Sequence, residues 1–273
     1  MNLVVQGPGL TPQQADELAR TRKIEWISEK AIRLRGIAVE KSLGPWCEER
    51  RLDFAWMPEG RRFADLKRLA MDMDSTLISI ECIDELGDLA GKGAEVAAIT
   101  ARAMRGEIDY PESLRKRVGL LAGLPETALG RVYEERLRLT PGAEKLIAAC
   151  KANGVKLLLV SGGFTFFTEK LRHRLGLDFT ISNVLEFSNG KLTGKLLGNI
   201  VDAEAKADRF RTIAKNLNAE KSLTVAIGDG ANDLKMMAEA GVSVAFRAKP
   251  VVQARATCAI NWSGLDGVLN LFD

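Results

Sequence analysis

The sequence predicts an α/β protein whose core is a mostly parallel β-sheet flanked by helices. From residue 68 onward, short apolar runs alternate with segments of helical periodicity. Strands that alternate with helices in this way form parallel sheets with right-handed crossovers. Between the first and second apolar runs, residues 78–137 show a continuous helical pattern. We interpret this stretch as a helical insertion that follows the first strand of the sheet.

A small α+β domain is expected ahead of the core, over residues 1–65. Its expected elements are a strand over 2–6, a helix from Pro12 to about Arg22, and weak strands over 32–39 and 52–56. Thr11 is a suitable N-cap for that helix, and Pro12 suits its first position. No motif in this domain carries chemistry, and residues 57–67 resemble a linker.

The core, residues 66–273, is expected to begin with a strand over 68–73. Apolar runs at 155–160, 223–228, 242–246 and 258–262 predict further strands, and residues 183–196 predict a hairpin. Asn189-Gly190 favours a type I′ turn in that hairpin. Helical periodicity covers residues 143–152, 166–175, 203–216 and 233–240.

Composition and charge disfavour several classes of function. The 273 residues have a net charge of +3, with acidic residues scattered among the basic ones, which does not indicate nucleic-acid binding. No apolar run is long enough to cross a bilayer, and the first residues lack the features of a signal peptide. The four cysteines form no CxxC pair, which is typical of reduced thiols. We expect a cytoplasmic protein that binds neither nucleic acid nor a membrane.

A single histidine limits the chemistry further. His173 lies in the charged segment EKLRHRLG and is expected at the surface. Ser-His-Asp catalysis and histidine-rich zinc sites are therefore disfavoured. If the protein is an enzyme, carboxylates and hydroxyls are expected to do the work.

Three apolar strands end in polar residues that suit chemistry. Asp72 and Asp74 follow the first, Ser161–Gly163 end the second, and Asp229 lies in GDGAND after a later one. Each motif alone is also compatible with a simple turn. Parallel strands, however, bring these ends to one edge of the sheet, where α/β proteins bind ligands. Residues i and i+2 of a strand share a side, so we expect Asp72 and Asp74 at one mouth. Three carboxylates there would repel one another unless a cation lies among them, and oxygen ligands favour Mg²⁺.

Taken together and in this order, the motifs resemble the haloacid dehalogenase superfamily. The pattern is Asp-x-Asp-x-Thr after a strand, a strand ending in Ser-Gly-Gly, a downstream lysine, and Gly-Asp-Gly-x-Asn-Asp. It covers about residues 68–273, and ECIDE, SLRKRV, SGGF and GDGANDL are similar to members that hydrolyse O-phospho-L-serine. The resemblance implies a Rossmann-like core with a helical cap at about residues 78–138, and Mg²⁺-dependent hydrolysis in the last step of serine biosynthesis. The first 65 residues lie outside it and are at most a divergent ACT-like domain.

The resemblance also implies roles for the carboxylates. Asp72 would be the nucleophile that forms an aspartyl-phosphate. Asp74 would protonate the leaving oxygen and later activate water. Mg²⁺ would be held by Asp72, the backbone carbonyl of Asp74 and Asp229, with Asp233 in the surrounding shell.

Residues that would bind the substrate follow from the same resemblance. Ser161 and the Gly162 N–H would bind phosphoryl oxygens near a helix N-terminus. Lys206 would offset transition-state charge, and Asn232 would position the phosphate. Glu81 would meet the substrate ammonium, and Arg117 its carboxylate. The expected substrate-binding residues are therefore Ser161, Gly162, Lys206, Asn232, Glu81 and Arg117.

Other readings of the same residues stay open at this point. One is a phosphotransferase, or a phosphatase for another small amino-acid-like phosphate, because one fold hosts many functions. Another is a regulator that binds phosphate without turnover, although such a protein has no need of both Asp72 and Asp74. A homodimer also stays open.

Overall fold

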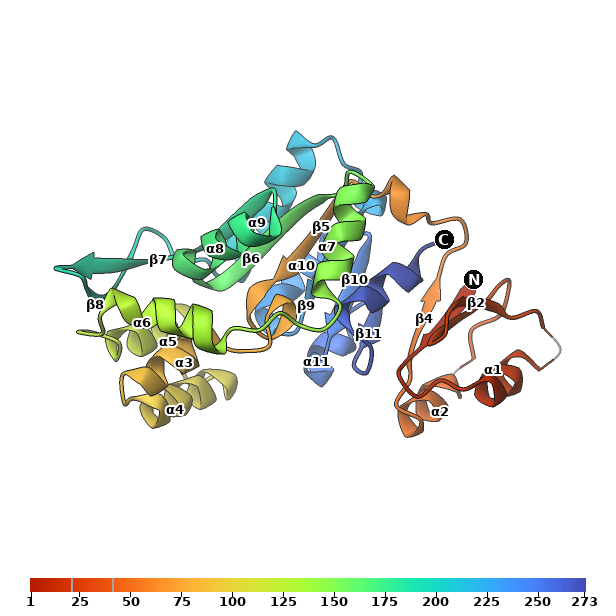
Figure 1. Cartoon of the computed structure of the whole chain (residues 1–273), viewed down its shortest axis with the longest axis horizontal. Coiled ribbons are helices and arrows are strands. Elements are labelled where there is room, and N and C mark those ends of the chain that lie inside the picture. The colour runs from red at the N-terminus through yellow and green to blue at the C-terminus, as the bar shows by residue number, and fades with distance from the viewer. Residues whose placement is uncertain (21, 41) are drawn as a thin grey trace.

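The computed structural model describes residues 1–20, 22–40 and 42–273. Figure 1 shows a small N-terminal unit beside a larger core, with a group of helices on the far side of that core. Two sheets organise the described part of the chain. The first is four-stranded, in the order β2-β3-β1-β4, and the second is seven-stranded, in the order β11-β10-β9-β5-β6-β7-β8.

The strands and helices have the following bounds. The strands are β1 (Asn2–Gln6), β2 (Glu25–Ser28), β3 (Ala31–Leu34), β4 (Asp53–Met57), β5 (Arg68–Asp72), β6 (Lys156–Phe164), β7 (Phe179–Ser188), β8 (Lys191–Leu197), β9 (Thr224–Gly228), β10 (Val242–Phe246) and β11 (Cys258–Ile260). The helices are α1 (Pro12–Ala19), α2 (Leu43–Glu49), α3 (Cys82–Leu89), α4 (Gly93–Met104), α5 (Tyr110–Gly119), α6 (Glu126–Arg131), α7 (Ala143–Ala152), α8 (Thr165–Leu175), α9 (Ala203–Asn216), α10 (Leu234–Ala238) and α11 (Pro250–Gln253).

The large sheet is parallel except for its last strand, β8, which pairs antiparallel with β7. Its central strands are buried on both faces, which explains their continuous apolar sequences. In β5, Leu69 and Met71 join one apolar cluster while Ala70 joins another on the opposite face. Helices α7 and α8 contribute to the first cluster, and α9 and α10 to the second. The result is a sheet between two helical layers, with its strand ends left free for a site.

The helices α3–α6 form a cap that leaves the core after β5 and returns before α7. Two chain segments make its neck: the Ser79 N–H donates to the Arg138 carbonyl, and the Thr140 N–H donates to the Leu77 carbonyl, both at 3.0 Å. The neck therefore holds the start and end of the cap side by side. This arrangement confirms the helical insertion that the sequence predicts.

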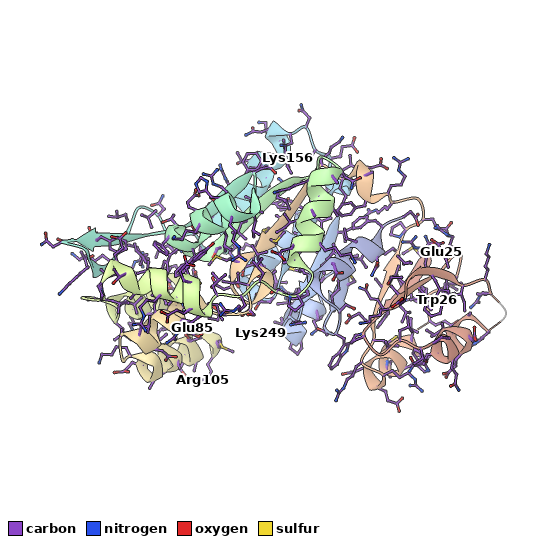
Figure 2. All side chains as sticks on the ribbon, in the orientation of Figure 1. Glu25, Trp26, Glu85, Arg105, Lys156 and Lys249 are labelled. Atoms are coloured by element: carbon purple, nitrogen blue, oxygen red, sulfur yellow. The ribbon has the colours of Figure 1, made fainter. Side chains whose placement is uncertain are left out.

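The N-terminal unit is tied to the core by buried charged groups. The Asp53 carboxylate accepts hydrogen bonds from the backbone N–H groups of Asn261 at 2.6 Å and Ser263 at 2.8 Å. Arg33 donates to the Phe272 carbonyl and pairs with Asp273 at 3.0 Å. It also pairs with Glu25, which Figure 2 labels, at 3.1 Å. Both chain termini consequently lie near this junction (Figure 1). The unit has β-α-β-β-α-β order, and a divergent ACT-like domain stays a prediction.

The structure differs from the sequence-based expectations mainly in the N-terminal unit. Helix α1 ends at Ala19 rather than near Arg22, because Arg20 adopts a left-handed φ of 55°. Strand β2 and helix α2 were not expected, since β2 is only four residues long and α2 carries Gly44 and Pro45 in its first turn. In the core, the type I′ turn is confirmed, with φ of 51° at Asn189 and 72° at Gly190.

None of the helices in residues 1–20, 22–40 and 42–273 is long and apolar enough to cross a membrane. The four cysteines are buried and form no disulfide. His173 is exposed on α8, as the sequence predicts.

Candidate active site

The ends of three neighbouring strands converge at one edge of the large sheet. Asp72 ends β5, Ser161 lies near the end of β6, and Asp229 follows the last residue of β9. Because β9, β5 and β6 are adjacent and parallel, their carboxyl ends meet. The sequence motifs that lie far apart along the chain are therefore brought together, as the strand pattern indicates.

Lys206 lies buried between two of the carboxylates. Its Nζ donates to Asp72 Oδ1 at 2.7 Å and to Asp233 Oδ1 at 2.8 Å. Burial alone would lower the pKa of Lys206, but the attraction of Asp233 and Asp72 raises it above its ordinary value. The lysine is thus held as a cation, although its charged helical sequence alone would favour a solvated side chain.

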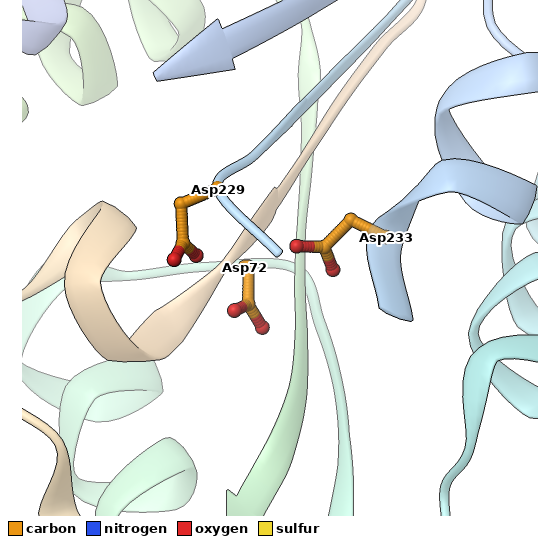
Figure 3. Close-up of side chains that lie close together, drawn as sticks. All are labelled: Asp72, Asp229 and Asp233. Carbon is orange, nitrogen blue, oxygen red and sulfur yellow. The ribbon is translucent and has the colours of Figure 1, made fainter. Parts of the chain in front are cut away.

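Asp72, Asp229 and Asp233 form a compact acidic cluster (Figure 3), with one oxygen from each lying within 4.8 Å of the others. Burial, followed by the charge of Asp233, raises the pKa of Asp229 to about 6. Burial, followed by the charge of Asp233, also raises the pKa of Asp72. The cluster holds more negative charge than one lysine balances, and its donors are all oxygens. It fits a hard divalent cation, which would lower these pKa values again.

The Asp74 carboxylate has its own hydrogen-bond partners, and Asp74 lies beyond the end of β5, so the two-residue period of a strand does not place it. Strand β5 ends at Asp72, and the chain then turns, with Ser75 at φ 56°. Asp74 Oδ1 accepts from the Cys82 N–H at 2.9 Å, and Oδ2 accepts from the Ser161 hydroxyl at 3.3 Å. Burial raises the pKa of Asp74, while the Cys82 hydrogen bond opposes that shift. The two aspartates therefore occupy separate environments.

The glycines of the Ser161–Gly163 segment are required by close approach. A Cβ on Gly162 would lie 2.2 Å from the Tyr110 hydroxyl, and one on Gly163 would lie 2.8 Å from Asp74 Oδ2. The Gly163 N–H donates to Ser161 Oγ at 2.8 Å. A side chain at either position would displace the Tyr110 hydroxyl or the Asp74 carboxylate, which is a physical reason for two consecutive glycines here.

The cap contributes Glu81 and Arg117 to the same region. Glu81 Oε1 accepts from the Ser75 hydroxyl at 2.7 Å, and surrounding protein together with the charge of Asp74 raises the pKa of Glu81 to about 7. On α5, Arg117 is half-buried and its Nε has no hydrogen-bond partner among the described residues. Its neighbours Arg115 and Lys116 are exposed. Arg117 is thus the basic residue of this helix with an unmet donor.

Several residues near the site were missed by the sequence reasoning. Tyr110, at the start of α5, donates to the Gly162 carbonyl at 3.1 Å, and Asn183 on β7 donates to the same oxygen at 2.8 Å. The Thr76 hydroxyl donates to Asp229 Oδ1 at 3.3 Å. Asn232, which the sequence motif did indicate, lies in the turn that follows β9. Tyr110 and Asn183 belong to no motif with a distinctive spacing, so only the fold reveals them, whereas Thr76 is the last residue of the Asp-x-Asp-x-Thr motif.

Comparisons of sequence show relatives of one kind. A family model described as haloacid dehalogenase-like hydrolase matches residues 69–238. A phosphoserine phosphatase from Polaromonas sp. (strain JS666) is 54% identical over 215 residues, which cover 77% of this chain and 91% of the relative. A phosphoserine phosphatase from Archaeoglobus fulgidus is 44% identical over 236 residues, covering 85% and 68%.

Solved structures are similar over the same region and beyond. A probable phosphoserine phosphatase from Vibrio cholerae has a TM-score of 0.86 and 40% identity, covering 99% of this chain and 86% of that one. A HAD family hydrolase from Salmonella enterica serovar Typhi has a TM-score of 0.90 and 30% identity, covering 100% and 98%. A substrate-bound phosphoserine phosphatase complex has a TM-score of 0.71 and 39% identity, covering 76% and 99%.

Proposed function

The chain belongs to the haloacid dehalogenase-like hydrolases, and we propose that it hydrolyses O-phospho-L-serine to L-serine and phosphate. The reaction would use Mg²⁺ and a phosphorylated aspartate, and would be the last step of serine biosynthesis. Relatives that are 54% and 44% identical are phosphoserine phosphatases. The fold is also shared with a substrate-bound structure of that enzyme.

The observation that carries the chemistry is the separation of two aspartates into different environments. Asp72 faces the Lys206 ammonium and the acidic cluster, whereas Asp74 is hydrogen-bonded by Cys82 and Ser161. Two carboxyl groups in unlike surroundings can take different roles in one reaction. Asp72 is then the nucleophile, and Asp74 is the general acid and base.

Asp72, Asp229 and the backbone carbonyl of Asp74 would hold the Mg²⁺, with Asp233 in the surrounding shell. When bound, the ion would screen the Asp72 carboxylate from the negative charge of the phosphate. The raised pKa of Asp229, about 6, is consistent with a site that needs such a cation.

The reaction proceeds in two displacements at phosphorus. A carboxylate oxygen of Asp72 attacks, the bond to the serine oxygen breaks, and Asp74 gives its proton to that oxygen. Asp74 then takes a proton from a water molecule whose oxygen attacks the phosphorus. The bond to Asp72 breaks, phosphate leaves and the carboxylate is restored. Lys206 offsets the charge that develops on the phosphoryl oxygens.

Substrate recognition would come from both the core and the cap. The Ser161 hydroxyl and the Gly162 N–H would bind phosphoryl oxygens, and Asn232 would position the phosphate. Glu81 would bind the ammonium of the substrate. Arg117 would bind its carboxylate, because the unpartnered Nε belongs to a planar fork that suits two carboxylate oxygens.

Release of inorganic phosphate from O-phospho-L-serine with Mg²⁺ tests the proposal. We expect activity that a chelator abolishes and Mg²⁺ restores. Added homoserine distinguishes a phosphotransferase, which would form phosphohomoserine, and a panel of amino-acid-like phosphates distinguishes another substrate. Binding of phosphoserine without phosphate release would point to the regulator instead.

Assembly and location stay predictions. A homodimer can be tested by sedimentation of the purified protein, and a cytoplasmic location by fractionation of cells. Neither outcome alters the chemistry proposed for Asp72 and Asp74.

A further inference from the structure

A tyrosine of the cap contacts the end of strand β6 beside the proposed phosphate site. The Tyr110 hydroxyl donates to the Gly162 carbonyl at 3.1 Å. Tyr110 is the first residue of α5, the helix that also carries Arg117. Burial raises the pKa of Tyr110 to about 12, so the hydroxyl keeps its proton and acts as a donor.

The Gly162 carbonyl belongs to a peptide unit that has a second partner on its other side. In a trans peptide the carbonyl of one residue and the N–H of the next point in opposite directions. The Gly163 N–H donates to Ser161 Oγ at 2.8 Å. The Ser161 hydroxyl in turn donates to Asp74 Oδ2 at 3.3 Å. One peptide plane therefore connects Tyr110 to the hydroxyl that holds Asp74.

Two further contacts define what Tyr110 adds to this chain of hydrogen bonds. Asn183 of the core donates to the same Gly162 carbonyl at 2.8 Å. One lone pair of that oxygen is therefore already engaged by the core. Tyr110 fills a second direction from the cap. The other oxygen of Asp74 accepts from the N–H of Cys82, the first residue of cap helix α3. Asp74 is thus held by the cap through Cys82 and by the end of β6 through Ser161.

We propose that Tyr110 is a positioning residue that couples seating of the cap on β6 to the orientation of Asp74, acting through the Gly162–Gly163 peptide and the Ser161 hydroxyl. The inference rests on the proposed function, because Asp74 is the general acid and base there. When the cap is seated, the Tyr110 hydroxyl fixes the peptide plane, and the Gly163 N–H of that plane holds Ser161 Oγ beside Asp74 Oδ2. When the cap lifts, this alignment relaxes, and proton transfer is disfavoured while the site is open to water.

If Tyr110 only stabilised the closed cap, as a latch would, its removal would change the kinetics differently. A latch stabilises the closed cap, so its loss raises KM and leaves proton transfer in the closed state unchanged. The coupling acts on Asp74, so its loss lowers kcat and leaves KM within about twofold. A split between kcat and KM therefore separates the two roles.

The first test is Tyr110→Phe, which removes only the hydroxyl. We expect kcat for phosphoserine to fall about 2- to 10-fold, the usual effect of one neutral hydrogen bond. Tyr133→Phe is the matched control, since Tyr133 is the other tyrosine of the chain and its ring lies under Lys170 rather than at the site. In single-turnover experiments, the loss should be larger for phosphoserine than for 4-nitrophenyl phosphate, whose leaving group needs no proton.

The second test is a double-mutant cycle with Ser161→Ala, because Tyr110 is inferred to act through Ser161. In the Ser161→Ala protein, adding Tyr110→Phe should change kcat by less than about twofold. Independent, multiplying losses would overturn the coupling, as would a rise in KM alone or equal losses on the two substrates.

If Ser161→Ala is too slow to measure, the comparison of leaving groups decides. If the wild-type protein does not hydrolyse phosphoserine but hydrolyses another monoester, the proposed function fails, and the cycle is run on that ester.

Discussion

Lys206 and Asp72 form a buried ion pair, with 2.7 Å between the ammonium nitrogen and Asp72 Oδ1. The same ammonium lies 2.8 Å from Asp233, so one lysine pairs with two of the three carboxylates in the cluster. Buried charges are costly unless they are paired. The arrangement therefore makes the stability of the site depend on Lys206 as well as on any bound cation.

We expect Lys206→Met to abolish turnover and to lower the free energy of unfolding. Removing one partner of a buried ion pair costs about 3–5 kcal/mol, because the remaining charge is left unpaired. Mg²⁺ should restore part of the loss, since it supplies positive charge to the same carboxylates. Thermal unfolding with and without Mg²⁺ measures this. Lys215→Met, at an exposed position of the same helix, is the control, and a Lys206→Met protein as stable as wild type would contradict the prediction.

The asparagine variants of the two aspartates should differ in their residual activity. Asp72→Asn should abolish turnover while the protein stays folded, because an amide cannot form the acyl-phosphate. Asp74→Asn should lower the rate by roughly 10²–10⁴, the usual contribution of a general acid–base group. Acid quenching followed by proteolytic mapping should place the phosphate on Asp72. Phosphate found on a serine would refute this mechanism.

Selection of phosphoserine should depend on Arg117. We expect Arg117→Ala to lower kcat/KM sharply for phosphoserine but to spare an aryl phosphate, which has no carboxylate. One charge-assisted hydrogen-bonded contact contributes about 1.5–3 kcal/mol. Arg115→Ala, on the exposed side of the same helix, should leave both substrates unaffected. Equal losses on the two substrates would mean that Arg117 serves the fold or the chemistry instead.

The pKa of Glu81 predicts a pH dependence of substrate binding. Although Glu81 is partly exposed, desolvation by the surrounding protein and the charge of Asp74 raise this pKa to about 7, so below that pH the carboxyl is protonated and cannot attract an ammonium. kcat/KM for phosphoserine should therefore fall as the pH drops below about 7. Saturating Mg²⁺ keeps the metal-binding carboxylates ionised during the measurement. The acidic limb should disappear in Glu81→Gln; if that variant keeps the same limb, another group is titrating.

Stability depends on the same pKa with the opposite sign, so it falls as the pH rises whereas binding improves. A carboxyl whose pKa is raised in the folded state contributes stability at pH values below its ordinary pKa. That contribution is lost as the pH rises through the folded-state pKa, about 7 for Glu81.

The convergence of strand ends could be predicted from the sequence, because it follows from β5, β6 and β9 being parallel neighbours. The different hydrogen-bond partners of Asp72 and Asp74 could not. They depend on where β5 ends and on the left-handed turn at Ser75, and strand boundaries are poorly specified by local pattern. Asp233, expected in the shell around the metal, accepts from Lys206 through Oδ1 and from the Gly230 N–H through Oδ2, and these contacts could not be predicted either.

The contacts of Tyr110 and Asn183 were also beyond the sequence. Each depends on packing between segments that are distant along the chain: 52 residues separate Tyr110 from Gly162, and 21 separate Asn183 from it. A tyrosine at the start of a helix and an asparagine in a strand have no periodicity that marks them. The helix α2 was missed for a different reason, since Gly44 and Pro45 are poor helix formers whose cost is small only in a first turn.

The N-terminal unit should stabilise the core without supplying a group to the reaction. The residues proposed for catalysis begin at Asp72, whereas Val4, Ala55 and Met57 pack into the main core cluster. Asp53 is 4% exposed and accepts N–H groups from the loop after β11. A chain that begins at Arg61 would leave that loop without its acceptor and would expose apolar core surface.

We therefore expect the chain that begins at Arg61 to unfold at a markedly lower temperature, yet to turn over substrate wherever it remains folded. Asp53→Asn is the milder test, because an amide offers a single neutral acceptor to the same N–H groups. It should cost about 1–3 kcal/mol of stability and leave kcat within about twofold. The control is Asp16→Asn, on helix α1 at an exposed position, which should change neither quantity. If Asp53→Asn loses turnover while its unfolding temperature is unchanged, the N-terminal unit acts on the site itself. Its role would then be to hold the strand ends in place, and the boundary near residue 65 would not separate two independent functions.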